Sequence, residues 1–281
     1  MQINLGFALL LTTLAGLSTG IGSAVAFFIR KPSYSFLSII TGFSAGVMLY
    51  ISFVELLQTA ISQVGFALAN IGFFTGIAFI AIVDILVPHE YEAEHLENRD
   101  ESSVNRTETV DERDHIIFSR PVKRNTPTLM RAGVFTAIGI AIHNFPEGLV
   151  TFSSVATGDI ALGIAVATAI GIHNIPEGIA VSVPIFYATN SRKRAFLFSF
   201  LSGLTEPLGA LIGYALLMPF LTPTFLSALL AFVAGIMVYI SLDELLPLAY
   251  RYGQGHLVIA GISGGMLVMA ISLYLLIQVG L

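Results

Sequence analysis

The stretch IHNFPEG at residues 142–148 recurs thirty residues later as IHNIPEG at residues 172–178. Each copy places an imidazole, a carboxamide and a carboxylate in the middle of a long apolar run. His143 and Glu147 are four residues apart, so they share one face if the run is helical, and Asn144 flanks that face. Ionisable groups in apolar surroundings are costly unless something compensates them. A partner for these groups is therefore expected elsewhere in the chain or in a bound ligand.

The composition is that of a membrane protein. Of 281 residues, 55% are hydrophobic and 11% charged, and the mean hydropathy is +0.84. A soluble domain carries about 25% charged residues. The absence of cysteine excludes disulfides, thiolate metal sites and cysteine nucleophiles. With a pI of about 5.6 and no basic patch outside the connections, the chain is not expected to bind nucleic acid.

Eight apolar runs reach the roughly 20 residues that a helix needs to cross a bilayer. They lie at residues 4–29, 34–58, 66–87, 129–152, 160–186, 195–217, 224–247 and 257–280. The first run has no basic residue before it and is longer than the ~7–15 residues of a signal-peptide core. We therefore expect an all-α polytopic membrane protein with eight transmembrane helices and no cleaved leader.

The basic residues are confined to alternate connections. All 13 Lys and Arg residues follow the first, third, fifth or seventh run. They are Arg30 and Lys31; Arg99, Arg106, Arg113, Arg120, Lys123, Arg124 and Arg131; Arg192, Lys193 and Arg194; and Arg251. Because cytoplasmic connections carry the excess of Lys and Arg, this distribution predicts that both termini lie outside.

One long connection separates two parts of a single membrane domain. Residues 1–88 hold the first three helices and residues 129–281 the remaining five, with a hydrophilic segment at residues 89–128 between them. This segment has low hydrophobicity and mixed charge, which predicts a disordered cytoplasmic loop. Its histidines are His89, His95 and His115. They could capture metal weakly, although their loose spacing favours an ordinary solvated linker.

A second pair of similar segments accompanies the first, and we call each such pair an echo. Residues 45–57 (AGVMLYISFVELL) resemble residues 234–246 (AGIMVYISLDELL). In both pairs the two members lie on helices of opposite direction, the fourth with the fifth and the second with the seventh. This relation predicts inverted repeats, helices 1–3 with 6–8 and helix 4 with 5. Many alternating-access transporters have this architecture, with the substrate near the midplane.

Three carboxylates are expected at mid-membrane depth, namely Glu147, Glu177 and Glu206. Each costs about 2.5–3.5 kcal/mol there. No Lys or Arg lies inside a membrane span to offset the charge, because Arg131, the third residue of the fourth run, is counted with the connection before it. The compensating charge must therefore come from bound protons or a bound cation.

The ligand types suggest which cation. His143, His173, Asn144 and Asn174 add imidazole and carboxamide groups to the three carboxylates. Nitrogen and oxygen ligands without thiolate suit a borderline divalent ion such as Zn²⁺, Fe²⁺, Co²⁺ or Mn²⁺, whereas Mg²⁺ and Ca²⁺ prefer oxygen alone. A single buried histidine is more often structural, but two, each four residues before a glutamate, favour a metal site.

Prolines and outlying carboxylates add to this interpretation. Pro146, Pro176 and Pro207 each adjoin a mid-membrane glutamate and remove a helical N–H, which predicts a broken backbone lining a cavity or, alternatively, a packing kink. Glu55 and Glu244 are mates in the second echo, and we expect Glu55 near the outer face of the membrane and Glu244 near the inner face. With Asp243 beside Glu244, they are candidate carboxylates along a transport path, or they simply reach towards interfacial water.

These motifs, together with SGLTEPLG at residues 202–209, resemble the ZIP (Zrt/Irt-like) family of metal-ion transporters, closest to its bacterial zinc-transporter branch of broad specificity. The resemblance covers all but residues 90–128. It implies a metal position at His143, Glu147, His173 and Glu177, with Met48 nearby. It also implies a second position at Asn144, Asn174 and Glu206, with Glu147 and Glu177 bridging the two. Some members have Gln-Asp in place of His173-Asn174, so the second position here has one carboxylate fewer.

The resemblance further implies a bacterial inner-membrane homodimer and an elevator-like motion of helices 1, 4, 5 and 6 against 2, 3, 7 and 8. The expected function is uptake of zinc, and of iron, manganese, cobalt or cadmium, by a symporter or facilitator. The metal is then a substrate, and no cofactor is expected. One alternative is an intramembrane metal-dependent hydrolase, although the chain lacks the HExxH motif of many such enzymes. The other is a proton-coupled exporter. A metal sensor is disfavoured because no soluble output domain is attached.

Overall fold

The computed structural model describes residues 5–29, 33–86, 126–156, 160–217, 222–253 and 255–278, and every element within these ranges is a helix. The predicted loop histidines lie outside the described residues. Helical structure follows from the apolar composition, because a segment in lipid must satisfy its backbone hydrogen bonds internally.

The helices correspond closely to the predicted runs. Their bounds are α1 Leu5–Phe28, α2 Tyr34–Ile51, η1 Ser52–Leu56, α3 Leu57–Val64, α4 Phe66–Leu86, α6 Thr126–Ala156, α7 Ile160–Thr189, α8 Arg192–Gly203, α9 Thr205–Leu217, α10 Pro223–Ile240, η3 Ser241–Leu245, α11 Leu246–Tyr252 and α12 Gly255–Gln278. Helix α6 begins at Thr126, inside the segment that we expected to be loop. Seven stretches of the described residues are long and apolar enough to cross a membrane, and α6 is not among them.

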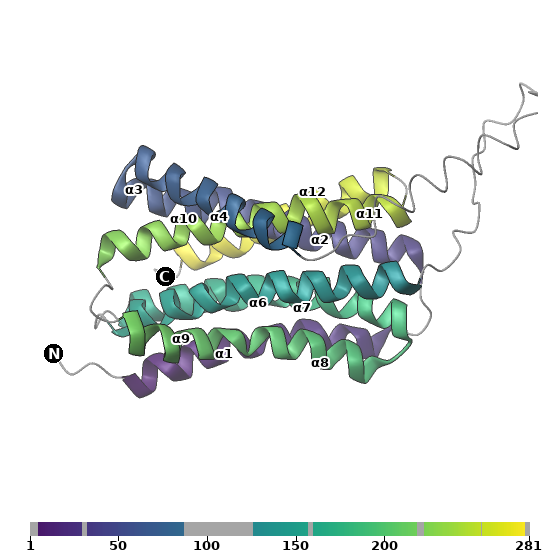
Figure 1. Cartoon of the computed structure of the whole chain (residues 1–281), viewed down its shortest axis with the longest axis horizontal. Coiled ribbons are helices and arrows are strands. Elements are labelled where there is room, and N and C mark those ends of the chain that lie inside the picture. Colours follow the sequence, from purple (N-terminus) through teal and green to yellow (C-terminus); the bar gives the residue numbers. More distant parts are fainter. Residues whose placement is uncertain are drawn as a thin grey trace, which may run out of the picture.

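Figure 1 shows α6 and α7 running through the middle of the molecule. On one side lie α1, α8 and α9, which together with α6 and α7 we call the central unit. On the other side lie α2, α3, α4, α10, α11 and α12, which we call the flanking unit (Figure 1). The two copies of the HN-x-PEG motif therefore sit on neighbouring helices between the outer layers.

Close glycine contacts hold the central unit together in a symmetric way. A Cβ on Gly22 of α1 would overlap the carbonyl oxygen of Ile175 in α7, and a Cβ on Gly209 of α9 would overlap that of Phe145 in α6. Ile175 and Phe145 are equivalent positions of the two motif copies. The pair α1–α7 thus repeats the pair α9–α6, as an inverted repeat requires.

The flanking unit obeys the same symmetry. Gly46 of α2 packs directly on the backbone of Ile262 in α12, and its mate Gly235 of α10 packs on the backbone of Phe73 in α4. The contacts therefore match α2 with α10 and α12 with α4. Small residues that let two backbones approach closely are typical of helix–helix interfaces in membranes.

A third echo becomes visible once the helices are paired. LAGLSTGIG at residues 14–22 of α1 aligns with LSGLTEPLG at residues 201–209 of the α8–α9 segment. The echo places Thr19 opposite Glu206. It was available in the sequence, but its identities are small apolar residues that are common in any membrane helix.

Two local features differ from simple expectation. Helices α6 and α7 continue through Pro146 and Pro176, so these prolines do not interrupt the helix. The break falls instead between α8 and α9 at Leu204, just before Pro207. In addition, α2 and α10 each pass into a π-helical turn at matching serines, Ser52 and Ser241. Such turns occur frequently at functional sites.

Contacts between chain segments place several connections at one end of the molecule. The Arg192 guanidinium donates to the carbonyl oxygen of Ile29 at 2.8 Å. Nearby, the Tyr187 hydroxyl donates to the carbonyl oxygen of Ser33 at 2.8 Å. The end of α1, the start of α2 and the α7–α8 connection therefore lie together, as the charge pattern predicts for connections on one side of a membrane.

Gly178 and Gly171 of α7 offer a matched test of the close packing. A Cβ at Gly178 would overlap the Thr19 carbonyl oxygen, whereas a Cβ at Gly171 would lie 3.8 Å from the Ser18 hydroxyl. Gly178→Ala should lower stability in detergent by about 1–3 kcal/mol because a backbone cannot yield easily. Gly171→Ala should be neutral or raise stability by up to about 1 kcal/mol. Thermal melting of the two variants decides this, and equal melting temperatures would contradict the packing.

Candidate metal site

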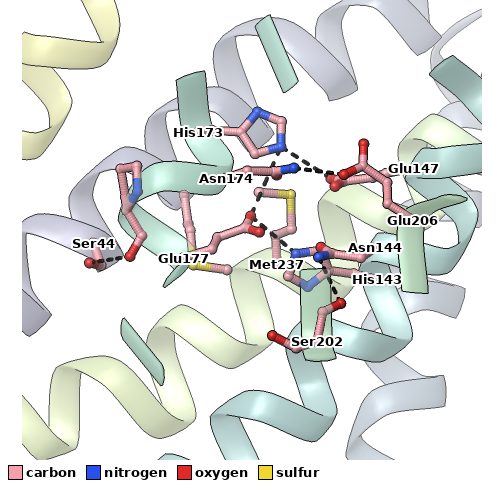
Figure 2. A network of polar contacts seen from close by, with 12 residues as sticks. Ser44, His143, Asn144, Glu147, His173, Asn174, Glu177, Ser202, Glu206 and Met237 are labelled. Atoms are coloured by element: carbon pink, nitrogen blue, oxygen red, sulfur yellow. Dashed lines mark hydrogen bonds and ion pairs between the residues drawn. The ribbon is translucent and has the colours of Figure 1, made fainter. Parts of the chain in front are cut away.

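The two motif copies meet in a fully enclosed polar centre. Every side chain of this centre is at most 2% exposed. Its members are His143, Asn144 and Glu147 of α6, His173, Asn174 and Glu177 of α7, and Glu206 of α9. Figure 2 shows these side chains converging from their separate helices. The structure thus brings together all the mid-membrane residues that the sequence singled out.

The closest histidine–glutamate contacts cross between the two helices. His143 Nε2 lies 3.1 Å from Glu177 Oε1, and His173 Nε2 lies 3.5 Å from Glu147 Oε1. Within α7, by contrast, His173 Nε2 and Glu177 Oε1 are 3.9 Å apart. Sequence spacing indicated only the same-helix pairs. The cross-helix arrangement is tighter and follows the pseudo-twofold relation between the copies.

One histidine is oriented by the backbone. His173 Nδ1 lies 3.1 Å from the carbonyl oxygen of Ala169, one turn earlier in α7. A carbonyl oxygen can only accept, so Nδ1 must carry the hydrogen, and in the neutral ring Nε2 then presents a lone pair. Fixing the tautomer through the far nitrogen is the usual way of preparing a metal-ligating histidine. The Nε2 lone pair faces the carboxylates of Glu147 and Glu177.

Both asparagines use their amide nitrogens in equivalent ways. Asn144 Nδ2 donates to the carbonyl oxygen of Ser202 at 3.3 Å, and Asn174 Nδ2 donates to that of Ala15 at 3.0 Å. Asn174 Nδ2 also donates to Glu206 Oε2 at 2.8 Å. These bonds fix each carboxamide group in the centre, and the carbonyl end of each group is left without a donor.

The centre has a surplus of acceptors. Among the described residues, no hydrogen bond reaches seven of its buried oxygen atoms. They are both carboxylate oxygens of Glu147 and of Glu177, Glu206 Oε1, Asn144 Oδ1 and Asn174 Oδ1. An unsatisfied buried acceptor costs about 1–3 kcal/mol, and more if it is charged. Acceptors gathered around a common point, without donors, can be satisfied by a cation.

The geometry of the cluster fits a small ion. One ligand atom from each of His143, Glu147 and Glu177 can be chosen so that all lie within 4.8 Å of one another. The atoms of the centre that could bind a metal are imidazole nitrogen, carboxylate oxygen and carboxamide oxygen, and this combination of ligands suits a borderline divalent metal. The centre is therefore a candidate metal site with three carboxylates to neutralise the ion.

Two methionines of the flanking unit complete its surroundings. Met48 of α2 and Met237 of α10 are both fully buried, and Figure 2 shows Met237 among the histidines and glutamates. The resemblance pointed to Met48 alone. Met237 was missed, although it is the mate of Met48 in the second sequence echo.

The outlying carboxylates lie apart from this centre. Glu55 is half-buried in η1. Asp243 and Glu244 of η3 instead join Asp84 of α4, with carboxylate oxygens within 4.8 Å of one another. The Tyr239 hydroxyl donates to Asp84 Oδ2 at 3.0 Å. No sequence pattern indicated a partner for Asp84, because α4 and η3 are far apart in the chain.

Comparison with known proteins agrees with this chemistry. A family model described as "ZIP Zinc transporter" matches residues 87–273. The chain is 51% identical over 290 residues to the zinc transporter ZupT of Clostridium perfringens, covering 98% of this chain and 97% of that protein. It is 53% identical over 279 residues to the zinc transporter ZupT of Chlorobium phaeovibrioides, covering 96% of this chain and 97% of that protein.

Replacing Glu177 with glutamine tests the surplus of hydrogen-bond acceptors through the melting temperature of the protein. Glu177→Gln keeps the shape of the side chain but supplies an N–H donor, so the metal-free variant should melt at or above the temperature of the unmodified protein. Added Zn²⁺ should raise the melting temperature of the unmodified protein by mass action but leave that of the variant unchanged. His256→Ala is the control, because His256 is exposed at the start of α12. An equal Zn²⁺ shift in Glu177→Gln would contradict the site.

Proposed function

The chain belongs to the ZIP zinc transporter family, and on that premise we propose that it carries Zn²⁺ into the cytoplasm by alternating access through the buried centre. Membership makes it a multi-pass membrane transporter for divalent metal rather than an enzyme. The zinc ion is its substrate.

The observation that carries the proposal is the surplus of buried acceptors between α6 and α7. A structural metal would need only one set of ligands and no path. Here the ligands come in inverted pairs, so the same chemistry faces both directions along the helices. An inverted pair of ligand sets is what a site opening to each side in turn requires.

The donor set also sets the range of ions. We propose that iron, manganese, cobalt and cadmium are carried as well, because imidazole and carboxylate ligands serve all of these divalent ions. One position would use His143, His173, Glu147 and Glu177. A second would use the carboxamide oxygens of Asn144 and Asn174 together with Glu206. The orphaned Oδ1 atoms of both asparagines support this second position.

For the membrane topology we propose eight spans, with α6 as the additional one. Helix α6 lies beside α7 in the middle of the molecule and carries half of the centre, so it must cross with its partner (Figure 1). Confinement of the basic residues to alternate connections supports both termini outside. The similarity to bacterial zinc transporters supports a bacterial inner-membrane location. Asp243 and Glu244 would then lie towards the cytoplasm, and Glu55 towards the outside.

The packing within and between the two units suggests how the metal is moved across the membrane. Within each unit the backbones touch at glycines, whereas between the units the Ile240 side chain packs over Gly139. The Ser44 hydroxyl also crosses between the units to the carbonyl oxygen of Pro176, at 2.8 Å. We propose that the central unit moves as a body past the flanking unit, carrying the metal with it.

Apolar side chains exposed on α4 and α12 offer surfaces to lipid and to a second copy of the chain.

Uptake into proteoliposomes tests the proposal. Glu147→Gln should lower uptake of radioactive Zn²⁺ by more than about tenfold, since even the outer partners of metal ligands change affinity by 10–100-fold. His256→Ala should transport normally, because its imidazole is remote from the centre. Normal uptake by Glu147→Gln, in protein that is folded and inserted, would refute transport through this centre.

The direction of transport is tested by a second experiment. The same proteoliposomes with a pH gradient of either sign distinguish a facilitator or symporter from a proton-coupled exporter. We expect Zn²⁺ to move down its own gradient into vesicles. Movement only when protons flow the opposite way would favour export.

A further inference from the structure

Met237 occupies a position that packing alone does not explain. Its side chain is completely buried, yet it lies in the most polar part of the molecule. Figure 2 shows it among His173, Glu177 and His143, the side chains that offer ligand atoms to a metal. A leucine would fill apolar space equally well, but it would bring no sulfur to this point.

The inverted symmetry gives Met237 a counterpart. Met48 and Met237 are matched in the repeat of residues 45–57 and 234–246, and both are fully buried. Each carries a backbone carbonyl that accepts a hydrogen bond from the serine four residues later. Ser52 Oγ donates to Met48 O at 2.7 Å, and Ser241 Oγ donates to Met237 O at 2.8 Å. Each serine begins a π-helical turn, so both methionines are held at the same point of matching helices.

The two methionines also share a relation to the rest of the centre. The histidines, asparagines and glutamates come from α6, α7 and α9 of the central unit, whereas Met48 and Met237 come from α2 and α10 of the flanking unit. Soft, uncharged sulfur therefore approaches from the opposite side to the hard, charged oxygens. A thioether adds no charge, so it does not worsen the surplus of negative charge.

We propose that the Met237 thioether contacts the transported ion and, with Met48, favours softer divalent ions over harder ones. This inference rests on the proposed function, because it assigns a selectivity role within the same site. Soft thioether ligands favour soft and borderline ions such as Cd²⁺ and Zn²⁺, whereas Mn²⁺ and Mg²⁺ prefer oxygen. Because the sulfur belongs to the flanking unit, the contact exists only while the central unit holds the ion at this level.

Methyl NMR of the folded protein tests the contact independently of transport. The chain has seven methionines, so ¹³C-methyl labelling gives a spectrum simple enough to assign by substitution. Cd²⁺ should shift the Met237 methyl resonance, and Mg²⁺ should not. The Met269 methyl, which is equally buried but lies on α12, should stay unchanged. An unshifted Met237 resonance, while Cd²⁺ shifts the ring resonances of the central histidines, would overturn the proposal.

Selectivity in proteoliposomes gives the functional readout. Met237→Leu keeps volume and apolarity, so it should leave folding intact while lowering uptake of Cd²⁺ relative to Mn²⁺ by about fivefold, in keeping with the loss of one soft ligand. Met269→Leu is the matched control and should leave the ratio unchanged. An unaltered ratio in Met237→Leu would show that Met237 only packs, with transport itself still standing. Absence of flux for every ion in the unmodified protein would instead remove the proposed function, and this inference with it.

Discussion

The structure depends on a surplus of hydrogen-bond acceptors over donors in one buried centre. Carboxylates of three helices and the carbonyl ends of two asparagines point into one enclosed volume. In water such a cluster would be unremarkable, but in an apolar interior its electrostatic cost is severe. Apart from Arg131 at the start of the fourth run, the chain supplies no Lys or Arg within its apolar runs. In the function proposed above, a divalent ion supplies the positive charge that these acceptors lack.

The inverted symmetry of the contacts relates the two halves of the centre to each other. Asn144 and Asn174 donate to equivalent backbone carbonyls, and Gly22 and Gly209 make equivalent close contacts with the motif helices. The halves differ at Thr19 and Glu206, which occupy equivalent positions in α1 and in the α8–α9 segment, so only one half contributes a third carboxylate.

Much of this was readable from the sequence, because the determining patterns are local. Long apolar runs gave the helices to within a few residues, and spacing of four gave each motif its ligand face. The pairing of His143 with Glu177 was not readable, since spacing reveals only neighbours on the same helix. Nor was the approach of Asp84 to Glu244, which depends on how α4 packs beside η3. A broken backbone was predicted at Pro146, Pro176 and Pro207, but the sequence could not show that only the last of these helices is interrupted, at Leu204, because all three prolines carry the same signal.

The most direct test of the central claim is zinc K-edge X-ray absorption of the protein loaded with one equivalent of Zn²⁺. The centre predicts nitrogen and oxygen ligands at about 2.0–2.2 Å, whether or not the Met237 sulfur also contacts the ion. It also predicts the multiple-scattering pattern of imidazole, lost when His143 and His173 are both replaced by alanine. A shell of oxygen alone, or a spectrum unchanged by that double substitution, would show that the ion binds elsewhere.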